Sequence, residues 1–261
     1  MKIFYENFDG IEYLLYEYFP NFKYFKIRTE EINNKDKIFK IKSNLQFNEP
    51  SKMNLKSIFS SIICKYCNNC IEIENSDRLP SIGWEELVDH WSCHNNEFKS
   101  LLNLKPKPRT NSILYSNFYF LINSINYCCW KENKENQILK IFYNEINTIY
   151  DDKDIIYIFL EEYFKNNDIL QINNVIIKFY NESIIAMEEN DENNGLHEYF
   201  YKSLKVGYKI VNKKHEKKEI NEYYRERIIA LLNENKIDRK IDGYILSFIF
   251  SDKTKIKEIR K

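Results

Sequence analysis

The amino-acid sequence predicts an α+β fold, mostly antiparallel β-sheets with a few short helices. Apolar and basic residues alternate close to period two near the N-terminus, which favours half-buried strands. Aromatic and β-branched residues fill several further short segments, and only a few stretches place apolar residues at helical spacing. With 43% hydrophobic and 16% aromatic residues, the 261-residue chain has enough apolar surface for a sizeable core.

The first part of the chain contains three predicted apolar elements. Residues 22–27 and 37–41 alternate like strands, and the polar residues 30–35 between them are a predicted turn. The apolar residues 55–63 form a third predicted strand, which leads directly into Cys64.

A helix is predicted to follow Pro80. Ser81 is its expected N-cap, because a serine side chain can accept a hydrogen bond from the first free backbone N–H groups. Trp84, Leu87 and Trp91 then recur at helical spacing on one apolar face.

The second half mixes short strands with two helices. Its predicted elements are a strand or hairpin arm over residues 113–125, a strand or helix over 139–149, a helix over 155–164, a hairpin turning at Asn181-Glu182 between residues 175–180 and 183–187, and a helix over 222–233. Before them, the Lys-Pro-Lys-Pro segment at 105–108 is a stiff linker. It predicts a β-rich lobe over residues 1–104 and an α+β lobe over 105–261, or one continuous domain.

Composition and charge exclude several classes of protein. The 39 basic and 39 acidic side chains cancel, so direct nucleic-acid binding is not expected. No apolar run is long enough to span a membrane, and the N-terminus does not resemble a secretory signal. We therefore expect a protein of the nucleus or the cytoplasm, where its six cysteines stay reduced.

Four cysteines and one histidine form the most specific pattern in the sequence. Cys64 and Cys67 have the CxxC spacing, in which a tight turn directs two thiolates toward one metal ion, and Cys93-His94 supplies a second pair of ligands. Cys70 is an alternative ligand. Four protein ligands leave no coordination position for a reactive water. The sequence therefore predicts a structural zinc that holds this segment of the fold together.

Two other interpretations of these residues remain. The cysteines could be reduced thiols without a metal, or Cys93 and His94 could act as a nucleophile and its base. Adjacent residues rarely point a nucleophile and a base at each other, so the second of these is disfavoured.

Opposite charges are separated in the last third of the chain. Residues 182–198 carry six acidic residues and no Lys or Arg, whereas residues 202–218 carry seven lysines and one glutamate. Blocks of this kind can steer a charged protein partner, or they can be a solvated loop and a solvated strand edge.

A longer pattern resembles the HECT-like ubiquitin-conjugating-enzyme-binding family. It consists of the CxxC at Cys64, the Leu-Pro-Ser-x-x-Trp segment at 79–84, and the Asp-x-Trp-x-Cys-His segment at 89–94. Weaker similarity continues through residues 117–122, 139–142, 204–209 and 242–244. Two features depart from the family: Asn68 replaces a glycine after the first CxxC, and the second CxxC is reduced to Cys128-Cys129.

The resemblance implies a protein partner. Members of the family are described as binding and stabilising the metallo-β-lactamase-type endonuclease that cleaves pre-mRNA 3′ ends before polyadenylation, and this non-catalytic role is the first expectation. The alternative is a ubiquitin ligase, or an adaptor that binds a ubiquitin-conjugating enzyme. No cysteine follows Cys129 to serve as the C-terminal nucleophile of a HECT ligase, which favours binding. If the chain is an enzyme, we expect a ubiquitin-protein transferase.

Overall fold

The computed structural model describes residues 2–8, 11–16, 29–31, 38–41, 53–60, 62–71, 73–79, 106–124, 137–190, 197–215 and 220–256. Two compact units emerge, and each is described by itself. Unit 1 contains residues 1–53, 160–216 and 225–261, and unit 2 contains residues 54–159 and 217–224. The predicted boundary between residues 104 and 105 lies outside the described residues and stays a prediction.

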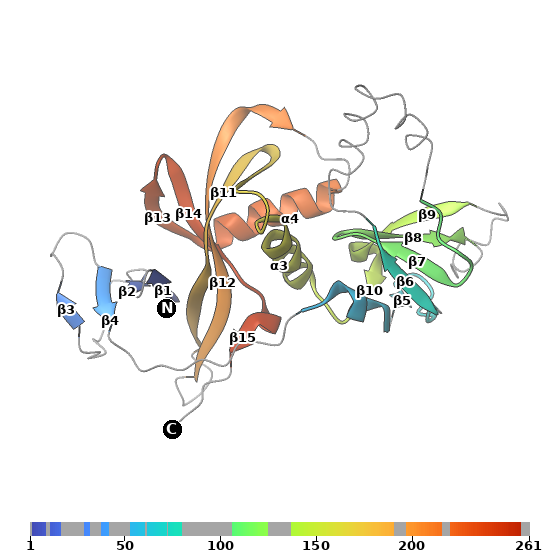
Figure 1. Cartoon of the computed structure of the whole chain (residues 1–261), viewed down its shortest axis with the longest axis horizontal. Coiled ribbons are helices and arrows are strands. Elements are labelled where there is room, and N and C mark those ends of the chain that lie inside the picture. The colour runs from blue at the N-terminus through green and yellow to red at the C-terminus, as the bar shows by residue number, and fades with distance from the viewer. Residues whose placement is uncertain are drawn as a thin grey trace. The chain divides into compact units, whose positions relative to one another are not determined.

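Unit 1 is built on one large antiparallel sheet. Its path runs β13-β14-β12-β11-β1-β2-β4-β3, and β15 pairs with β12 beside this path (Figure 1). The strands are β1 (Lys2–Phe8), β2 (Ile11–Tyr16), β3 (Thr29–Glu31), β4 (Ile38–Ile41), β11 (Ile169–Asn190), β12 (His197–His215), β13 (Lys236–Ile241), β14 (Tyr244–Ile249) and β15 (Lys255–Ile256). The mostly antiparallel α+β fold predicted from the sequence is confirmed.

The centre of this sheet is the long β11–β12 hairpin. The predicted turn at Asn181-Glu182 is wrong, because β11 continues through these residues for 22 positions. The pairing with β12 shifts between Phe179 and Asn181 and again between Asn181 and Ile184. Asn181 therefore marks an irregularity in a long strand, since pairing with β12 on one side and with β1 on the other continues beyond it.

Two α-helices lie in the described part of the chain, and both were predicted. They are α3 (Asp152–Tyr163) and α4 (Glu222–Glu234). The C-terminal part of α4 packs against one face of the sheet: the Ser247 hydroxyl donates to the Leu232 carbonyl at 2.8 Å, and the Tyr208 hydroxyl lies 2.7 Å from Asn233 Oδ1. Ser247 and Tyr208 are buried on β14 and β12. Leu246 and Phe248, at the alternate positions of β14, are buried with Tyr201 in a cluster on the other face, so side chains on both faces of this part of the sheet are buried.

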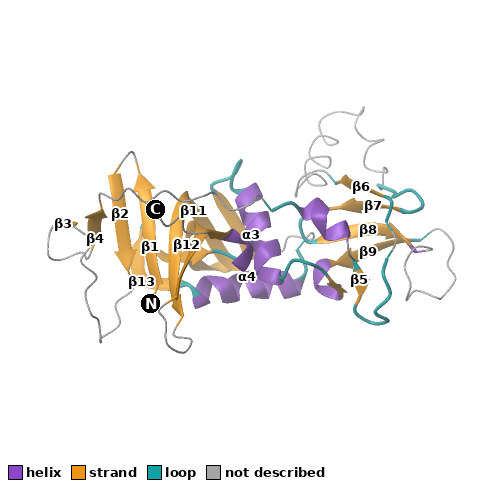
Figure 2. Ribbon diagram, turned by 90° about the horizontal axis from the view of Figure 1, so that it is seen from below, coloured by secondary structure: helices purple, strands orange, loops and turns teal. Residues whose placement is uncertain are grey.

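Unit 2 contains a four-stranded sheet (Figure 2) and a small two-stranded ribbon, whose strands are labelled in Figure 1. The sheet has the order β6-β7-β8-β9, in which the β6–β7 pair is parallel and the others are antiparallel. Its strands are β6 (Asn75–Arg78), β7 (Ser112–Tyr115), β8 (Tyr119–Asn123) and β9 (Ile138–Phe142). The ribbon joins β5 (Ile63–Cys64) to β10 (Ile146–Asn147), and the short 3₁₀ helices η1 (Leu55–Ser60) and η4 (Tyr143–Glu145) precede these two strands.

Aromatic side chains dominate the core of unit 2. Phe59 of η1 packs against Tyr115 with 5.0 Å between ring centroids, and Phe120 stacks on Tyr143 at 6.1 Å. Phe118, fully buried between β7 and β8, contacts the rings of Phe159 and Tyr224. This second group joins three segments that are far apart in the sequence.

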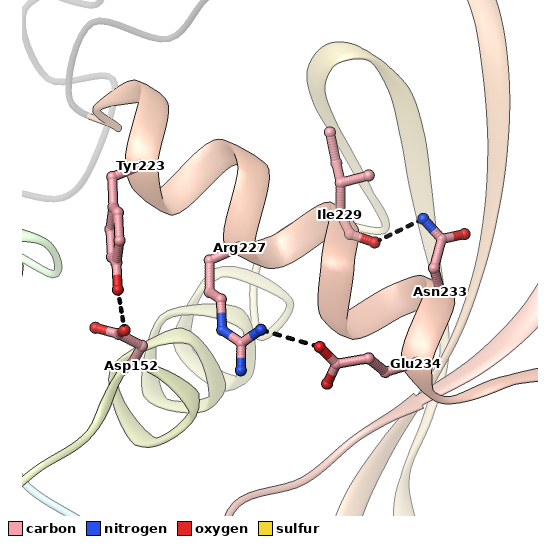
Figure 3. A network of polar contacts seen from close by, with 6 residues as sticks. All are labelled: Asp152, Tyr223, Arg227, Ile229, Asn233 and Glu234. Atoms are coloured by element: carbon pink, nitrogen blue, oxygen red, sulfur yellow. Dashed lines mark hydrogen bonds and ion pairs between the residues drawn. The ribbon is translucent and has the colours of Figure 1, made fainter.

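Polar contacts fix α4 at its surface, as Figure 3 shows. The Tyr223 hydroxyl donates to a carboxylate oxygen of Asp152 at the start of α3. Within α4, Arg227 pairs with Glu234 at 2.9 Å, and the Asn233 side chain donates to the Ile229 carbonyl at 3.0 Å.

The N-terminal predictions were less accurate than those for the helices. Residues 38–41 form β4 as expected, but residues 30 and 31 belong to β3 and not to a turn. The predicted strand over 55–63 is a 3₁₀ helix followed by the two-residue β5. The predicted strand at 22–27 and the predicted helix after Ser81 lie outside the described residues. None of the helices in the described ranges has the length and apolarity to cross a membrane.

Candidate metal centre and partner-binding ribbon

The CxxC segment folds back on itself as a tight loop, which we call the knuckle (residues 62–71). The Cys64 N–H donates to the Asn69 carbonyl at 3.0 Å, and the Asn68 N–H donates back to the Cys64 carbonyl at 2.9 Å. One step further out, the Ile71 N–H donates to the Ile62 carbonyl at 3.0 Å. These backbone bonds close the turn between the two cysteines of the CxxC, as a two-thiolate metal site requires.

Asn68 takes the conformation that glycine usually provides after such a turn. Its φ is 56°, in the left-handed region that asparagine tolerates better than other residues with a side chain. The departure from the family's glycine at this position therefore leaves the shape of the knuckle intact.

Asn68 provides a direct test of the knuckle. Asn68→Gly should leave the free energy of unfolding nearly unchanged, whereas Asn68→Val should reduce it by about 1–2 kcal/mol because a β-branched residue is strained at positive φ. Asn69→Val is the matched control, because Asn69 has no positive φ. Urea denaturation of the three variants measures the difference in the free energy of unfolding. Equal stability of the two valine variants would contradict the positive φ of residue 68.

The three described cysteines differ sharply in exposure. Cys64 is fully buried, whereas Cys67 and Cys70 are exposed, and none of the three forms a disulfide. The Cys70 Sγ lies 3.9 Å from the Ile71 carbonyl oxygen. The donor chemistry and the closed turn around Cys64 and Cys67 fit half of a tetrahedral zinc site.

The other half of the predicted zinc site falls on residues that the structure does not describe. Cys93 and His94 lie outside the described residues, as do Cys128 and Cys129. Within the described ranges, no three Cys, His, Asp or Glu side chains come together as a metal site, so the knuckle cysteines alone do not make one. The assignment of Cys64, Cys67, Cys93 and His94 as ligands therefore stays a prediction.

The β5–β10 ribbon has one buried face and one exposed face. Cys64 pairs with Ile146 and both are buried, whereas Ile63 pairs with Asn147 and both are exposed. The exposed fraction is 39% for Ile63 and 46% for Ile149, two residues beyond Asn147. Tyr66 at the tip of the knuckle is 74% exposed. We call Ile63, Tyr66 and Ile149 the ribbon face.

Hydrogen bonds hold both sides of this ribbon to the rest of unit 2. The Lys65 ammonium donates to the Asn144 carbonyl of η4 at 2.6 Å. On the other side, the hydroxyl of Tyr150, three residues after β10, lies 2.9 Å from Oγ of Ser57 in η1. The ribbon face is therefore presented on a backbone that is anchored at the knuckle and just beyond β10.

Reasoning from the sequence missed the ribbon face. Isoleucine and tyrosine are abundant throughout the chain, so neither residue stands out. Ile62 and Ile63 look equivalent in the sequence, yet Ile62 is fully buried and Ile63 is exposed. The alternation of strand side chains around the buried Cys64 is the one signal that points Ile63 outward.

Comparison with known proteins adds three findings. Residues 22–155 match the family described as "HECT-like Ubiquitin-conjugating enzyme (E2)-binding". A curated rat (Rattus norvegicus) protein, described as an "E3 ubiquitin-protein ligase", is 37% identical over 67 residues, which cover 23% of this chain and 17% of the relative. The chain thus matches only about a sixth of that relative's length. No solved structure matches the chain.

The family match includes the knuckle, the ribbon and most of unit 2. It covers 134 of the 261 residues, counted from 22 to 155 inclusive. The resemblance inferred from the CxxC and Cys-His pattern is therefore confirmed at the level of the family: this protein belongs to the HECT-like ubiquitin-conjugating enzyme (E2)-binding family.

Proposed function

We propose that this protein binds a ubiquitin-conjugating enzyme and that the ribbon face is the contact surface. The observation that carries the proposal is the position of exposed apolar side chains. Large hydrophobic residues that are exposed within both the described structure and the family match are limited to Ile63, Tyr66 and Ile149. Ile63 and Tyr66 lie on the ribbon and its knuckle, and Ile149 follows β10 by two residues.

Contiguous exposed apolar residues are typical of protein-protein contacts, and these three residues belong to β5, to the knuckle that follows it and to the segment just after β10. Tyrosine and isoleucine supply contact area that is lost from water on binding, and tyrosine is enriched among the residues that dominate binding free energy. Asn68 and Asn69, both exposed, follow Tyr66 closely in the sequence and provide the polar rim that such an interface needs.

The anchored backbone strengthens this proposal. Lys65 is held to Asn144 by a short hydrogen bond, so the knuckle tip that carries Tyr66 is fixed before a partner arrives. A surface that is already ordered loses less conformational entropy on binding than a mobile loop does.

We further propose that zinc is bound by Cys64, Cys67, Cys93 and His94, with a structural role. The buried Cys64 and the closed CxxC turn support half of this site. When bound, the metal would tie the knuckle to the segment that contains Cys93, and so would hold the backbone under Tyr66 in place.

Binding to purified ubiquitin-conjugating enzymes tests the main proposal. In titration calorimetry against a panel of these enzymes, Ile63→Asp should raise the dissociation constant for the binding member by about thirtyfold or more, the effect of removing a dominant apolar contact of about 2 kcal/mol. Tyr66→Ala should weaken binding in the same direction.

The matched control is Ile169→Asp. Ile169 is 52% exposed but lies in unit 1, outside the family match, so the same substitution there should leave binding unchanged. Equal binding by the Ile63 and Ile169 variants would place the contact elsewhere, and failure of every enzyme in the panel to bind would refute the function itself.

The family match favours this function over the endonuclease partnership that the sequence suggested first. Whether the protein is an adaptor or a ligase follows from a second assay. A ubiquitin-charged conjugating enzyme is incubated with the chain, and the products are resolved without reductant. A thioester on Cys128 or Cys129 would identify a transferase, whereas binding without transfer identifies an adaptor.

A further inference from the structure

We propose that unit 1 carries a binding surface for an acidic segment of a partner protein. The surface lies on the face of the large sheet that does not meet α4, and it consists of Lys178, Lys209, Tyr180, Tyr244 and Ile169, which we call the lysine surface. It belongs to unit 1 and lies outside the residues of the family match. The inference is therefore independent of binding to a ubiquitin-conjugating enzyme.

The register of three strands places the lysine surface on one face of the sheet. Lys178 pairs with Gly207, which pairs with Leu246, so these three positions point to the same side. Lys209 and Tyr244 lie two residues from Gly207 and Leu246 along β12 and β14, so they point to that side as well. The next position on β14 points to the other side and contacts α4.

Two ammonium groups share one aromatic ring at this surface. The Lys178 and Lys209 nitrogens lie 5.8 Å and 4.4 Å from the ring centroid of Tyr244, and the Lys178 nitrogen lies 5.3 Å from that of Tyr180. Each ammonium is attracted to the ring, whereas the two ammonium groups repel each other. Among the described residues no ion pair involves Lys209. An anion that contacts both lysines would remove this repulsion.

The rings that hold the lysines are fixed by their own contacts. A Cβ atom at position 207 would lie 2.7 Å from Tyr180 Cε2 and 2.8 Å from Tyr244 Cβ, so the glycine of β12 allows both rings to lie close over the strand. The Tyr180 hydroxyl donates to the Ile241 carbonyl at 3.3 Å. Because the rings are ordered before a partner arrives, the lysines that lie on them lose less conformational entropy on binding.

Asp242 shows how a carboxylate meets this surface. Its carboxylate pairs with Lys178 at 3.6 Å, and its side chain is 70% exposed. An exposed ion pair of this kind contributes little free energy, so a segment that carries several carboxylates can displace it. Asp242 is therefore an internal competitor for the proposed partner.

An exposed apolar residue lies beside the lysines. The Phe179 N–H donates to the Asp168 carbonyl at 2.9 Å, so the chain doubles back at the start of β11. Asn173, with a φ of 52°, provides the left-handed residue of this tight turn. The resulting register places Ile169 opposite Lys178, on the same face of the sheet. Ile169 is half-exposed and offers apolar contact area next to the charges.

The chemistry of the surface favours a protein segment over a nucleic acid. The two lysine side chains lie against the ring of Tyr244, which is only 8% exposed, so a base has no free ring there on which to stack. Carboxylates need only the ammonium groups, and both lysines keep part of their surface exposed. A segment with several glutamates or aspartates and an apolar side chain for Ile169 therefore fits this surface.

Fluorescence anisotropy of the full chain with a labelled peptide tests this surface. The probe is a repeat of two glutamates and one leucine. At low salt we expect saturable binding whose dissociation constant rises at least about tenfold at high salt, because the contact is electrostatic. Lys178→Gln/Lys209→Gln should weaken binding at least about tenfold, and Asp242→Asn should strengthen it about threefold or more because the competing carboxylate is removed. Asparagine tolerates the positive φ of residue 242.

The charge-matched control is Lys153→Gln/Lys165→Gln, which makes the same change in net charge on and just after α3 and should bind the probe like the wild type. Ile169→Asp should weaken binding of the probe, although it is expected to leave binding of a conjugating enzyme unchanged. Circular dichroism verifies that each variant is folded. Chemical acetylation followed by mass spectrometry should show that the probe protects Lys178 and Lys209.

Three outcomes would overturn the proposal. They are the absence of probe binding at low salt, equal loss of binding in the two double-lysine variants, and tighter binding of a labelled single-stranded oligonucleotide than of the peptide at the same salt concentration. The last result would assign the lysine surface to a nucleic acid instead. None of the three bears on the ribbon face, because that surface is tested with conjugating enzymes and with substitutions in unit 2.

Discussion

Replacing the exposed Cys67 by serine is expected to reduce the free energy of unfolding by at least about 2 kcal/mol and to abolish stoichiometric zinc binding. An exposed cysteine that binds nothing can be exchanged for serine at a cost within about 0.5 kcal/mol. A zinc ligand cannot, because metal binding contributes on the order of 10 kcal/mol or more to the folding of a structural site. The exposure of Cys67 therefore makes it the most discriminating position in the predicted set.

Cys70→Ser is the matched control, three residues further along the same knuckle. Cys70 is also exposed, so the two substitutions compare the predicted ligand with the alternative ligand at positions that are both exposed. Urea denaturation with and without a chelator, together with metal analysis of the purified chain, gives the comparison. If Cys67→Ser is as mild as Cys70→Ser, the knuckle holds no metal, and if the two effects are reversed, Cys70 is the ligand.

Cys64 is the less informative ligand to replace. Its side chain is fully buried opposite Ile146, so a serine hydroxyl there would cost about 1–3 kcal/mol of desolvation even without a metal. Loss of stability in Cys64→Ser thus cannot separate a zinc ligand from a packed thiol. The exposed Cys67 separates the two because packing contributes little to it.

The sequence predicted those elements whose signal is local. α3 and α4 show apolar spacing over more than ten residues, and their predicted bounds differ from the observed ones by three residues or fewer. The β-rich segment 113–125 was also recognisable as a strand or hairpin arm, but it forms two antiparallel strands, β7 and β8, and the turn between them was not predicted. Apolar residues that recur at helical spacing over several turns are a strong local signal, so long helices are among the elements that a sequence predicts best.

The errors arise where neighbouring strands determine the outcome. Asn181-Glu182 has the composition of a turn, yet the pairing of β11 with both β1 and β12 carries the strand through it. The apolar residues 55–63 have strand composition, but six of them form η1 and bury Phe59 among the rings of Tyr115 and Phe120. In both cases the structure is decided by contacts with residues that are distant in the sequence. The local composition of a segment carries no information about such contacts.

The candidate site also has one part that the sequence predicted and one part that it did not. The Cys64–Cys67 spacing and the family were readable from the sequence because cysteine and histidine are rare residues with specific chemistry. The ribbon face was not, because it depends on the pairing of β5 with a strand about eighty residues further along the chain. Pairing of Cys64 with Ile146 turns one face inward and leaves Ile63 on the outside.

Replacing Phe118 by alanine is expected to cost about 3–5 kcal/mol of the free energy of unfolding, the largest effect expected of the core substitutions in unit 2. Phe118 is fully buried, and its ring centroid lies 4.6 Å from that of Phe159 and 4.8 Å from that of Tyr224. Its carbonyl also accepts a hydrogen bond of 3.0 Å from the Tyr143 N–H. Truncation would leave a cavity among these rings and remove two favourable aromatic contacts.

The cavity would also affect a buried hydroxyl. Tyr224 is fully buried, and burial, with the nearby Asp152 carboxylate as a smaller cause, raises the pKa of its phenol above the ordinary value. Tyr224 is therefore a neutral side chain of the core, and its ring packs against that of Phe118. Water that enters the cavity beside Tyr224 would weaken the packing of the first turn of α4 in unit 2.

Two variants separate the loss of volume from the loss of the aromatic ring. Phe118→Leu keeps most of the side-chain volume and should cost less than half as much as Phe118→Ala. Phe142→Ala removes a ring that is only partly buried, although it contacts Tyr119 at 5.7 Å, and should also be milder. Urea denaturation ranks the three variants. If Phe118→Ala is no worse than Phe142→Ala, the packing of Phe118 against Phe159 and Tyr224 does not hold these three segments of unit 2 together.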